Sequence, residues 1–135
     1  MRFYTLNVSQ PHNRKDYIQH NLTLPTGRDV IVNALPSLKA AGTTVAPKRV
    51  LTEGNYVVIH SDYNFGGPKT GFDIFHLENG KIVEHWDNLQ DATAPNPSGH
   101  TTLDGTTTIT DLDKTDENKA YVKSFVENIL MGCPA

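Results

Sequence analysis

The spacing of apolar residues changes along the chain, and the first clear pattern is helical. Five apolar side chains fall on one face at helical spacing: Val30, Ile31, Ala34, Leu35 and Leu38. This spacing predicts a helix that begins at Thr26 or Gly27 and ends near Gly42. Pro36 lies within this segment and has no backbone N–H, so we expect a kink or two short helical pieces.

The middle of the chain has the pattern of β-strands joined by turns. Residues 16–21 can form a short first strand, and residues 49–53 precede another strand at 56–61. Residues 72–77 and 81–89 flank Asn79-Gly80, whose residues tolerate the positive φ of a type I′ hairpin turn. These successive strands predict an antiparallel meander. The Gly- and Pro-containing segment 64–71 is expected to be a loop, and residues 106–110 a small edge strand.

A second helix is predicted near the end of the chain. Its apolar residues again follow helical spacing: Tyr121, Val122, Phe125, Val126, Ile129 and Leu130. We expect Thr115 to be the N-cap, and Gly132 to end the helix. Full burial stabilises each such apolar side chain by about 1.5–3 kcal/mol, so we expect this stripe to be covered in the folded protein.

Composition is that of an ordinary globular protein. The 135 residues, 37% of them hydrophobic, fit a single domain spanning residues 1–135. The net charge of −3 and the absence of a dense basic patch argue against nucleic acid as a partner. No apolar run is long enough to span a membrane, and the N-terminus does not resemble a signal peptide. We therefore expect a cytoplasmic protein.

Sequence motifs for several kinds of site are missing. Cys133 is the single cysteine, so no internal disulfide is expected. No His or Cys pair has the spacing of metal ligands, and we expect no metal site. The chain also lacks a phosphate-binding Gly-rich loop and the Gly-x-Ser-x-Gly motif of serine hydrolases. We accordingly predict no cofactor.

Asp87 is the strongest candidate for chemistry. On a strand, Val83, His85, Asp87 and Leu89 share one face. His85 can therefore orient the carboxyl group of Asp87, or it can instead be a surface or interface histidine. An aspartate in an apolar pocket resists ionisation, which suits a general acid/base. The alternative is a solvated aspartate near the end of a strand.

Two further residues can assist Asp87. His20 titrates near neutral pH and can donate or accept a proton, or it can instead form a structural hydrogen bond. Asp73 shares a face with Phe75 on the neighbouring strand. If Asp73 points inward beside Asp87, the two carboxylates will repel and share a proton. If it points outward, it only adds solubility.

Three segments resemble the SnoaL-like polyketide cyclases of the nuclear transport factor 2-like superfamily. Residues 17–21 lead into the first helix as in that family. Residues 72–90 are similar to its Asp-Gly-Lys-Ile-x-Glu-His-Trp-Asp hairpin, and residues 118–130 to its first helix. The resemblance implies an α+β fold in which a curved antiparallel sheet wraps around helices and forms a cone-shaped barrel with an apolar pocket.

The order of the segments departs from the family pattern. The family's first helix normally precedes the segment that matches residues 17–21, whereas its counterpart here comes last. The departure predicts either a permuted domain or a helix exchanged with a partner. Members of the superfamily commonly pair through the outer face of the sheet, so we expect a homodimer.

The resemblance also implies a function. The family's general acid/base aspartate matches Asp87, while the opposing histidine of the cyclases is replaced by Asp73. We expect cofactor-free acid/base chemistry on a small apolar molecule, as a cyclase, isomerase or hydrolase, with His20, His85 or Asp73 assisting. Predicted ligand contacts are Tyr17, Trp86, Phe75 and His60. The alternatives are a non-catalytic ligand-binding protein on the same fold, or a structural role with the pocket filled by side chains.

Overall fold

The computed structural model describes residues 12–132. The chain forms two compact parts, Met1–Gly105 and Thr106–Ala135.

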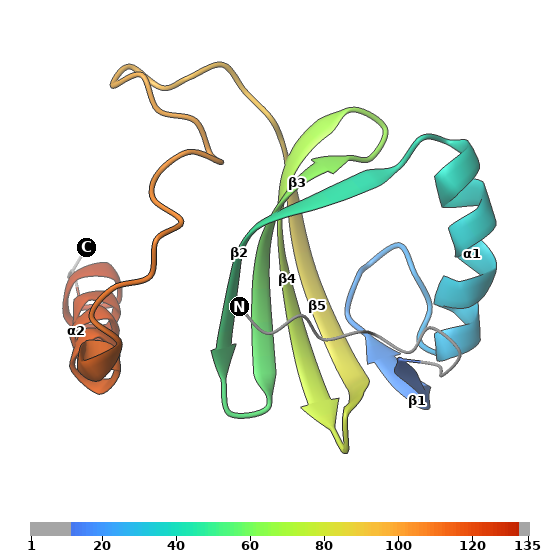
Figure 1. The fold of residues 1–135 in the computed structure, drawn as a ribbon, viewed down its shortest axis with the longest axis horizontal. Helices are drawn as coiled ribbons and strands as arrows, with labels where there is room; N and C mark the ends of the chain where they lie inside the picture. The colour runs from blue at the N-terminus through green and yellow to red at the C-terminus, as the bar shows by residue number, and fades with distance from the viewer. Residues whose placement is uncertain (1–11, 133–135) are drawn as a thin grey trace. The chain divides into compact units, whose positions relative to one another are not determined.

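The first part is built on a curved sheet of five strands (Figure 1). In chain order the strands are β1 (Asn13–Gln19), β2 (Thr44–Glu53), β3 (Tyr56–Asn64), β4 (Pro68–Glu78) and β5 (Lys81–Asp91). Their order in the sheet is β1-β5-β4-β3-β2, with β1 parallel to β5 and the other pairs antiparallel. The predicted α+β class and the meander are confirmed.

The strands extend further than the sequence pattern predicts. The loop predicted over 64–71 is shorter than expected, because β3 continues to Asn64 and β4 already begins at Pro68, which leaves only residues 65–67 between the strands. A proline is tolerated there because the first residue of a strand need not donate to the ladder. The β4–β5 turn is as predicted, since Asn79 and Gly80 have φ of 51° and 73°.

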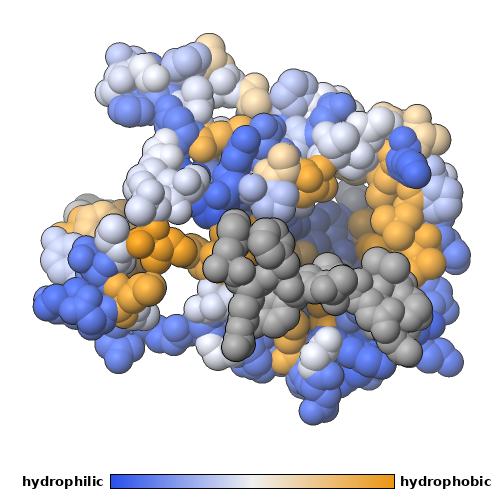
Figure 2. Space-filling view, in the orientation of Figure 1, coloured by the Kyte–Doolittle hydropathy of each residue, from blue (hydrophilic) through white to orange (hydrophobic). Residues whose placement is uncertain are grey.

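One helix, α1 (Arg28–Ala40), connects β1 to β2 and confirms the predicted element. The helix is a single element that includes Pro36, so the alternative of two separate helical pieces is wrong. Val30, Ile31, Ala34 and Leu38 are half-buried, whereas Leu35 is 54% exposed, contrary to its predicted place in the stripe. Figure 2 shows the apolar side chains of α1 on its sheet-facing side.

The strand register separates two sets of side chains on the sheet. We call one face the Asp87 face, because Asp73 lies opposite Asp87 and Phe75 opposite His85 in the β4–β5 pair. The other face, which we call the Trp86 face, carries Ile74 opposite Trp86. The alternation predicted for both strands is therefore confirmed. Val83 and His85 on the Asp87 face are both buried.

The second part contains a 3-10 turn (Leu112–Lys114), α2 (Thr115–Phe125) and a π-helical turn (Val126–Leu130). Residues 106–110 do not form the predicted strand. Thr115 is not the N-cap, because the 3-10 turn precedes the helix and the Thr115 hydroxyl donates to the carbonyl of Leu112 at 2.9 Å. The apolar stripe exists, and Tyr121, Phe125 and Leu130 are 78%, 49% and 64% exposed. Across residues 12–132, no helix has the length and hydrophobicity needed to span a membrane.

Candidate functional site

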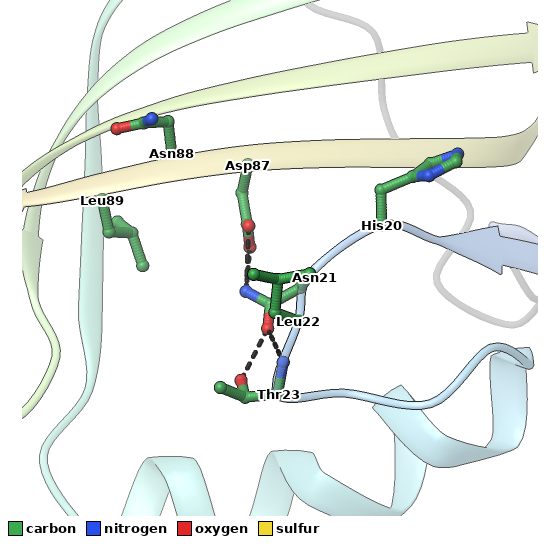
Figure 3. Close-up of a pocket in the computed structure, with 7 residues that line it drawn as sticks. All are labelled: His20, Asn21, Leu22, Thr23, Asp87, Asn88 and Leu89. Atoms are coloured by element: carbon green, nitrogen blue, oxygen red, sulfur yellow. Dashed lines mark hydrogen bonds between the residues drawn. The ribbon is translucent and has the colours of Figure 1, made fainter.

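A cavity of about 310 Å³ lies between the loop that follows β1 and the second half of β5 (Figure 3). Its lining consists of two short runs of chain, His20 to Thr23 and Asp87 to Leu89. The strand alternation turns Asp87 and Leu89 toward the loop, and the half-buried carboxyl group of Asp87 reaches the cavity. The most strongly predicted catalytic residue is thus at the wall of a cavity.

Asn21 holds the carboxyl group of Asp87 in place (Figure 3). Its side-chain nitrogen donates to both carboxylate oxygens, at 2.9 and 2.7 Å. Its side-chain oxygen accepts from the backbone N–H of Thr23 at 2.8 Å and from the Thr23 hydroxyl at 2.5 Å. A carboxyl group held in this way has a fixed position at the cavity wall, within reach of a ligand proton.

A chain of hydrogen bonds crosses the Asp87 face next to this cavity. The Tyr63 hydroxyl donates to Oδ2 of Asp73 at 2.5 Å, and Oδ1 of Asp73 lies 3.2 Å from Nε2 of His85. Nδ1 of His85 lies 3.1 Å from the side-chain oxygen of Gln19, whose nitrogen donates to the Tyr17 hydroxyl at 3.1 Å. Four strands therefore contribute to one connected polar network, and its members Asp73, His85 and Gln19 are each 8% exposed.

The two phenols of this network remain neutral. Burial, together with the charges of Asp87 and Asp73, raises the pKa of Tyr17 to about 12. Burial, the hydrogen bond to Asp73 and the nearby carboxylate charges raise the pKa of Tyr63 as well. At neutral pH both hydroxyl groups thus keep their protons and can donate hydrogen bonds.

Aromatic stacking fixes the plane of His85. The Phe75 ring lies almost parallel to it, with centroids 4.6 Å apart, and Tyr17 stacks on it at 6.5 Å. The structure thereby brings together five of the predicted site residues on the Asp87 face: Asp87, His85, Asp73, Phe75 and Tyr17.

The other three predicted residues have contacts on the Trp86 face. The His20 ring stacks on Trp86 with centroids 4.7 Å apart, and its Nε2 lies 2.8 Å from Glu84. His20 is one of the residues that line the cavity, but its imidazole lies beside β5, away from the carboxyl group of Asp87 (Figure 3). The structural alternative for His20, a hydrogen bond that ties the end of β1 to its neighbour, describes these contacts.

His60 is also remote from the carboxyl group of Asp87. It is buried against Phe72, with ring centroids 4.3 Å apart, and its Nδ1 accepts from Nη1 of Arg49 at 3.0 Å. Burial and the charge of Arg49 lower the pKa of His60. We therefore do not include His20, His60 or Trp86 in the acid/base site.

Sequence reasoning missed three residues of the site. Gln19 continues the alternation of Tyr17 along β1, and Asn21 follows two residues later. That period-2 pattern was available as a signal. Tyr63 was missed because β3 was expected to end at Ser61, before the strand brings the Tyr63 side chain onto the Asp87 face.

Metal-binding geometry is missing from the region that the structure covers. Within residues 12–132, no group of three or more His, Cys, Asp or Glu side chains is arranged to hold a metal ion.

Solved structures identify the fold. A nuclear transport factor 2-like protein of unknown function from Cytophaga hutchinsonii superimposes with a TM-score of 0.53 at 18% identity, over 58% of this chain and 70% of that chain. A second protein of this kind, from Burkholderia xenovorans, superimposes with a TM-score of 0.50 at 23% identity. The match covers 64% of this chain and 71% of that chain. A candidate polyketide cyclase from Sinorhizobium meliloti superimposes with a TM-score of 0.50 at 17% identity. The match covers 56% of this chain and 74% of that chain. The chain has the nuclear transport factor 2-like fold.

These similarities show the fold alone, because fold and reaction are separable at such low identity. In sequence, no family profile and no curated protein matches the chain. Function must accordingly be argued from the residues of the site.

Proposed function

We propose that this protein is a cofactor-free enzyme that uses Asp87 as a general acid/base on a small, largely apolar molecule. The observation that carries the proposal is the position of Asp87, whose carboxyl group lines the cavity and is fixed by two contacts from Asn21. A general base must lie within hydrogen-bonding reach of the proton that it removes, and a held carboxylate at a cavity wall meets that requirement.

The chemistry that fits this arrangement is proton transfer at carbon. A carboxylate removes a proton next to a carbonyl group, and a neutral hydrogen-bond donor stabilises the negative charge that develops on the carbonyl oxygen. The Tyr17 hydroxyl accepts from Gln19 and keeps its own phenol proton on the same face of the sheet, whereas Tyr63 donates its proton to Asp73. Cyclisations, isomerisations and some hydrolytic reactions can begin or end with such a step.

The polar network also supports an enzyme over the two alternatives. A protein that only holds an apolar ligand needs few buried ionisable groups, and a structural protein needs none. Here Asp73 and His85 are buried next to a third ionisable residue, Asp87. Buried ionisable groups are costly, and they gather at sites where proton transfer is required.

The test is hydrogen–deuterium exchange at carbon. Small cyclic ketones, such as 2-tetralone and 2-cyclohexenone, are incubated with the full chain in D₂O, and loss of the α-proton signals is followed by NMR. We expect accelerated exchange for at least one ketone and loss of that acceleration in Asp87→Asn. Asp91→Asn is the matched control, because Asp91 is exposed further along β5 and pairs with Lys69. Equal exchange by Asp87→Asn and the wild type would contradict the proposal.

A further inference from the structure

The hydrogen bonds around Gln19 determine which of its side-chain ends faces His85. The Gln19 side-chain oxygen accepts from the backbone N–H of Asn21 at 3.1 Å, and its nitrogen donates to the Tyr17 hydroxyl at 3.1 Å. A backbone N–H can only donate, so turning the amide over would place two donors against each other. The orientation of Gln19 is therefore fixed by the backbone.

That orientation determines a proton position on His85. Nδ1 of the ring lies 3.1 Å from the Gln19 oxygen. An amide oxygen has no proton to give, so Nδ1 must carry the proton of this hydrogen bond. A neutral histidine carries one ring proton, and a proton on Nδ1 therefore leaves Nε2 bare.

The other side of the ring then requires a second proton. Nε2 of His85 lies 3.2 Å from Oδ1 of Asp73, and the two residues are each 8% exposed. A bare Nε2 and an ionised carboxylate would place two lone pairs against each other in a buried site, which is costly. One proton between these atoms removes the conflict, either as an imidazolium facing a carboxylate or as a neutral ring facing a protonated Asp73. Both forms have no net charge.

We propose that Gln19 is a positioning residue that holds His85 in the form protonated on Nδ1, so that the His85–Asp73 pair retains one further proton at neutral pH. The groups that face His85 are Asp73 from β4, Tyr17 from β1 and Asp87 from its own strand, and Tyr63 from β3 reaches it through Asp73. The raised pKa values of both tyrosines keep them uncharged. Within residues 12–132, the hydrogen bonds of this network include no lysine or arginine, so the positive charge of the proton is balanced within the His85–Asp73 pair itself.

The retained proton also indicates a substrate class for the proposed enzyme. This inference rests on the proposed role of Asp87 as a general acid/base. The pair is neutral, so the uncompensated charge at the cavity is the single negative charge of Asp87. A ligand carboxylate or phosphate would meet that charge, and none of the seven residues that line the cavity is a lysine or arginine, whereas a neutral ketone or alcohol brings no charge to oppose Asp87. The site therefore selects neutral carbonyl or hydroxyl compounds over their acidic analogues.

The proton positions are measured on the full chain without any ligand. Long-range ¹H–¹⁵N NMR of histidine-labelled protein distinguishes a protonated from a bare ring nitrogen, and His85→Gln assigns the signal. We expect Nδ1 of His85 to be protonated at pH 7 in the wild type. Gln19→Leu should lose that preference, Gln19→Glu should restore it through its acceptor oxygen, and the exposed Gln90→Leu should leave it unchanged. A bare Nδ1 in the wild type overturns the proposal, whether or not the variants fold.

The substrate class is measured separately by calorimetry. We expect 2-tetralone to bind at least about tenfold more tightly than 1,2,3,4-tetrahydro-2-naphthoate, which has a comparable ring system and adds one negative charge near Asp87. Equal or tighter binding of the carboxylate overturns the selection. The NMR spectra are recorded without ligand. The predicted protonation of His85 can therefore prove wrong while Asp87-dependent exchange at carbon is still observed. If no exchange at carbon is observed but the His85 signals are as predicted, the proton positions are confirmed and the proposed acid/base function is rejected.

Discussion

Adding one methyl group at Gly71 tests the packing of the Asp87 face. Gly71 is buried in β4, and its φ lies outside the positive range, so alanine can adopt its backbone conformation without strain. A Cβ at this position would lie 2.5 Å from Cε2 of Tyr63 and 2.7 Å from Cδ2 of Leu89. Since ordinary contacts begin near 3.4 Å, the Tyr63 ring must move by about 0.9 Å.

That movement weakens the hydrogen bond from Tyr63 to Asp73. Overpacking a well-filled site costs about 1–3 kcal/mol, and a hydrogen bond to a charged group contributes about 1.5–3 kcal/mol. The two costs are not added, because the Tyr63 ring either stays and is overpacked by the new methyl group, or moves away and loses its hydrogen bond to Asp73. We therefore expect Gly71→Ala to lower the free energy of unfolding by about 1–3 kcal/mol.

Urea unfolding followed by Trp86 fluorescence measures this loss as a lower midpoint at unchanged slope. The double variant Gly71→Ala/Tyr63→Leu is the control, because leucine lacks the ring atoms that the new methyl group meets. The Gly71 substitution should cost at least about 0.5 kcal/mol less in that background. A Gly71→Ala protein within about 0.5 kcal/mol of the wild type would refute the reasoning about this contact.

Three further predictions concern pH, assembly and the C-terminal helix. The pKa of Tyr17 is about 12 in the folded protein and 10.0 in the unfolded chain. The folded state therefore loses about 2–3 kcal/mol of stability as the pH rises from 10 to 12. In urea unfolding, Tyr17→Phe should lose less stability than the wild type over this pH range. We propose that the protein forms a homodimer through the Trp86 face. Light scattering at micromolar concentration should report a dimer for the wild type and weaker association for Ile74→Glu, and a wild-type monomer would contradict the proposal. We also propose that α2 covers apolar surface in its own or a partner subunit, so deleting residues 115–135 should lower the thermal midpoint, and an unchanged midpoint contradicts it.

The sequence predicts those features that depend on local pattern. The spacing of Val30, Ala34 and Leu38 predicts α1, and the turn preference of Asn79-Gly80 predicts the hairpin. The period of two along β5 places Asp87 and His85 on one face, as the structure confirms. Each of these inferences needs only neighbouring residues.

Features that depend on pairing between distant residues were not predictable in this way. The contact of Gln19 with His85 requires β1 to lie parallel to β5, and no local pattern specifies that register. His20 shows the same limit. Its residue type suits acid/base chemistry, yet the stacking partner that determines its role, Trp86, is 66 positions away in the chain. Local propensity also placed the start of β4 too late, because pairing with β3 extends the strand to Pro68.

The central claim is that Asp87 acts on a ligand bound in the cavity beside Asn21, and a crystal structure of the full chain soaked with 2-tetralone tests it most directly. We predict ligand density between the loop of residues 20–23 and β5, with the ketone's α-carbon within reach of the Asp87 carboxylate. Density that lies instead on the Trp86 face, or a ligand whose reactive carbon points away from Asp87, would contradict the account.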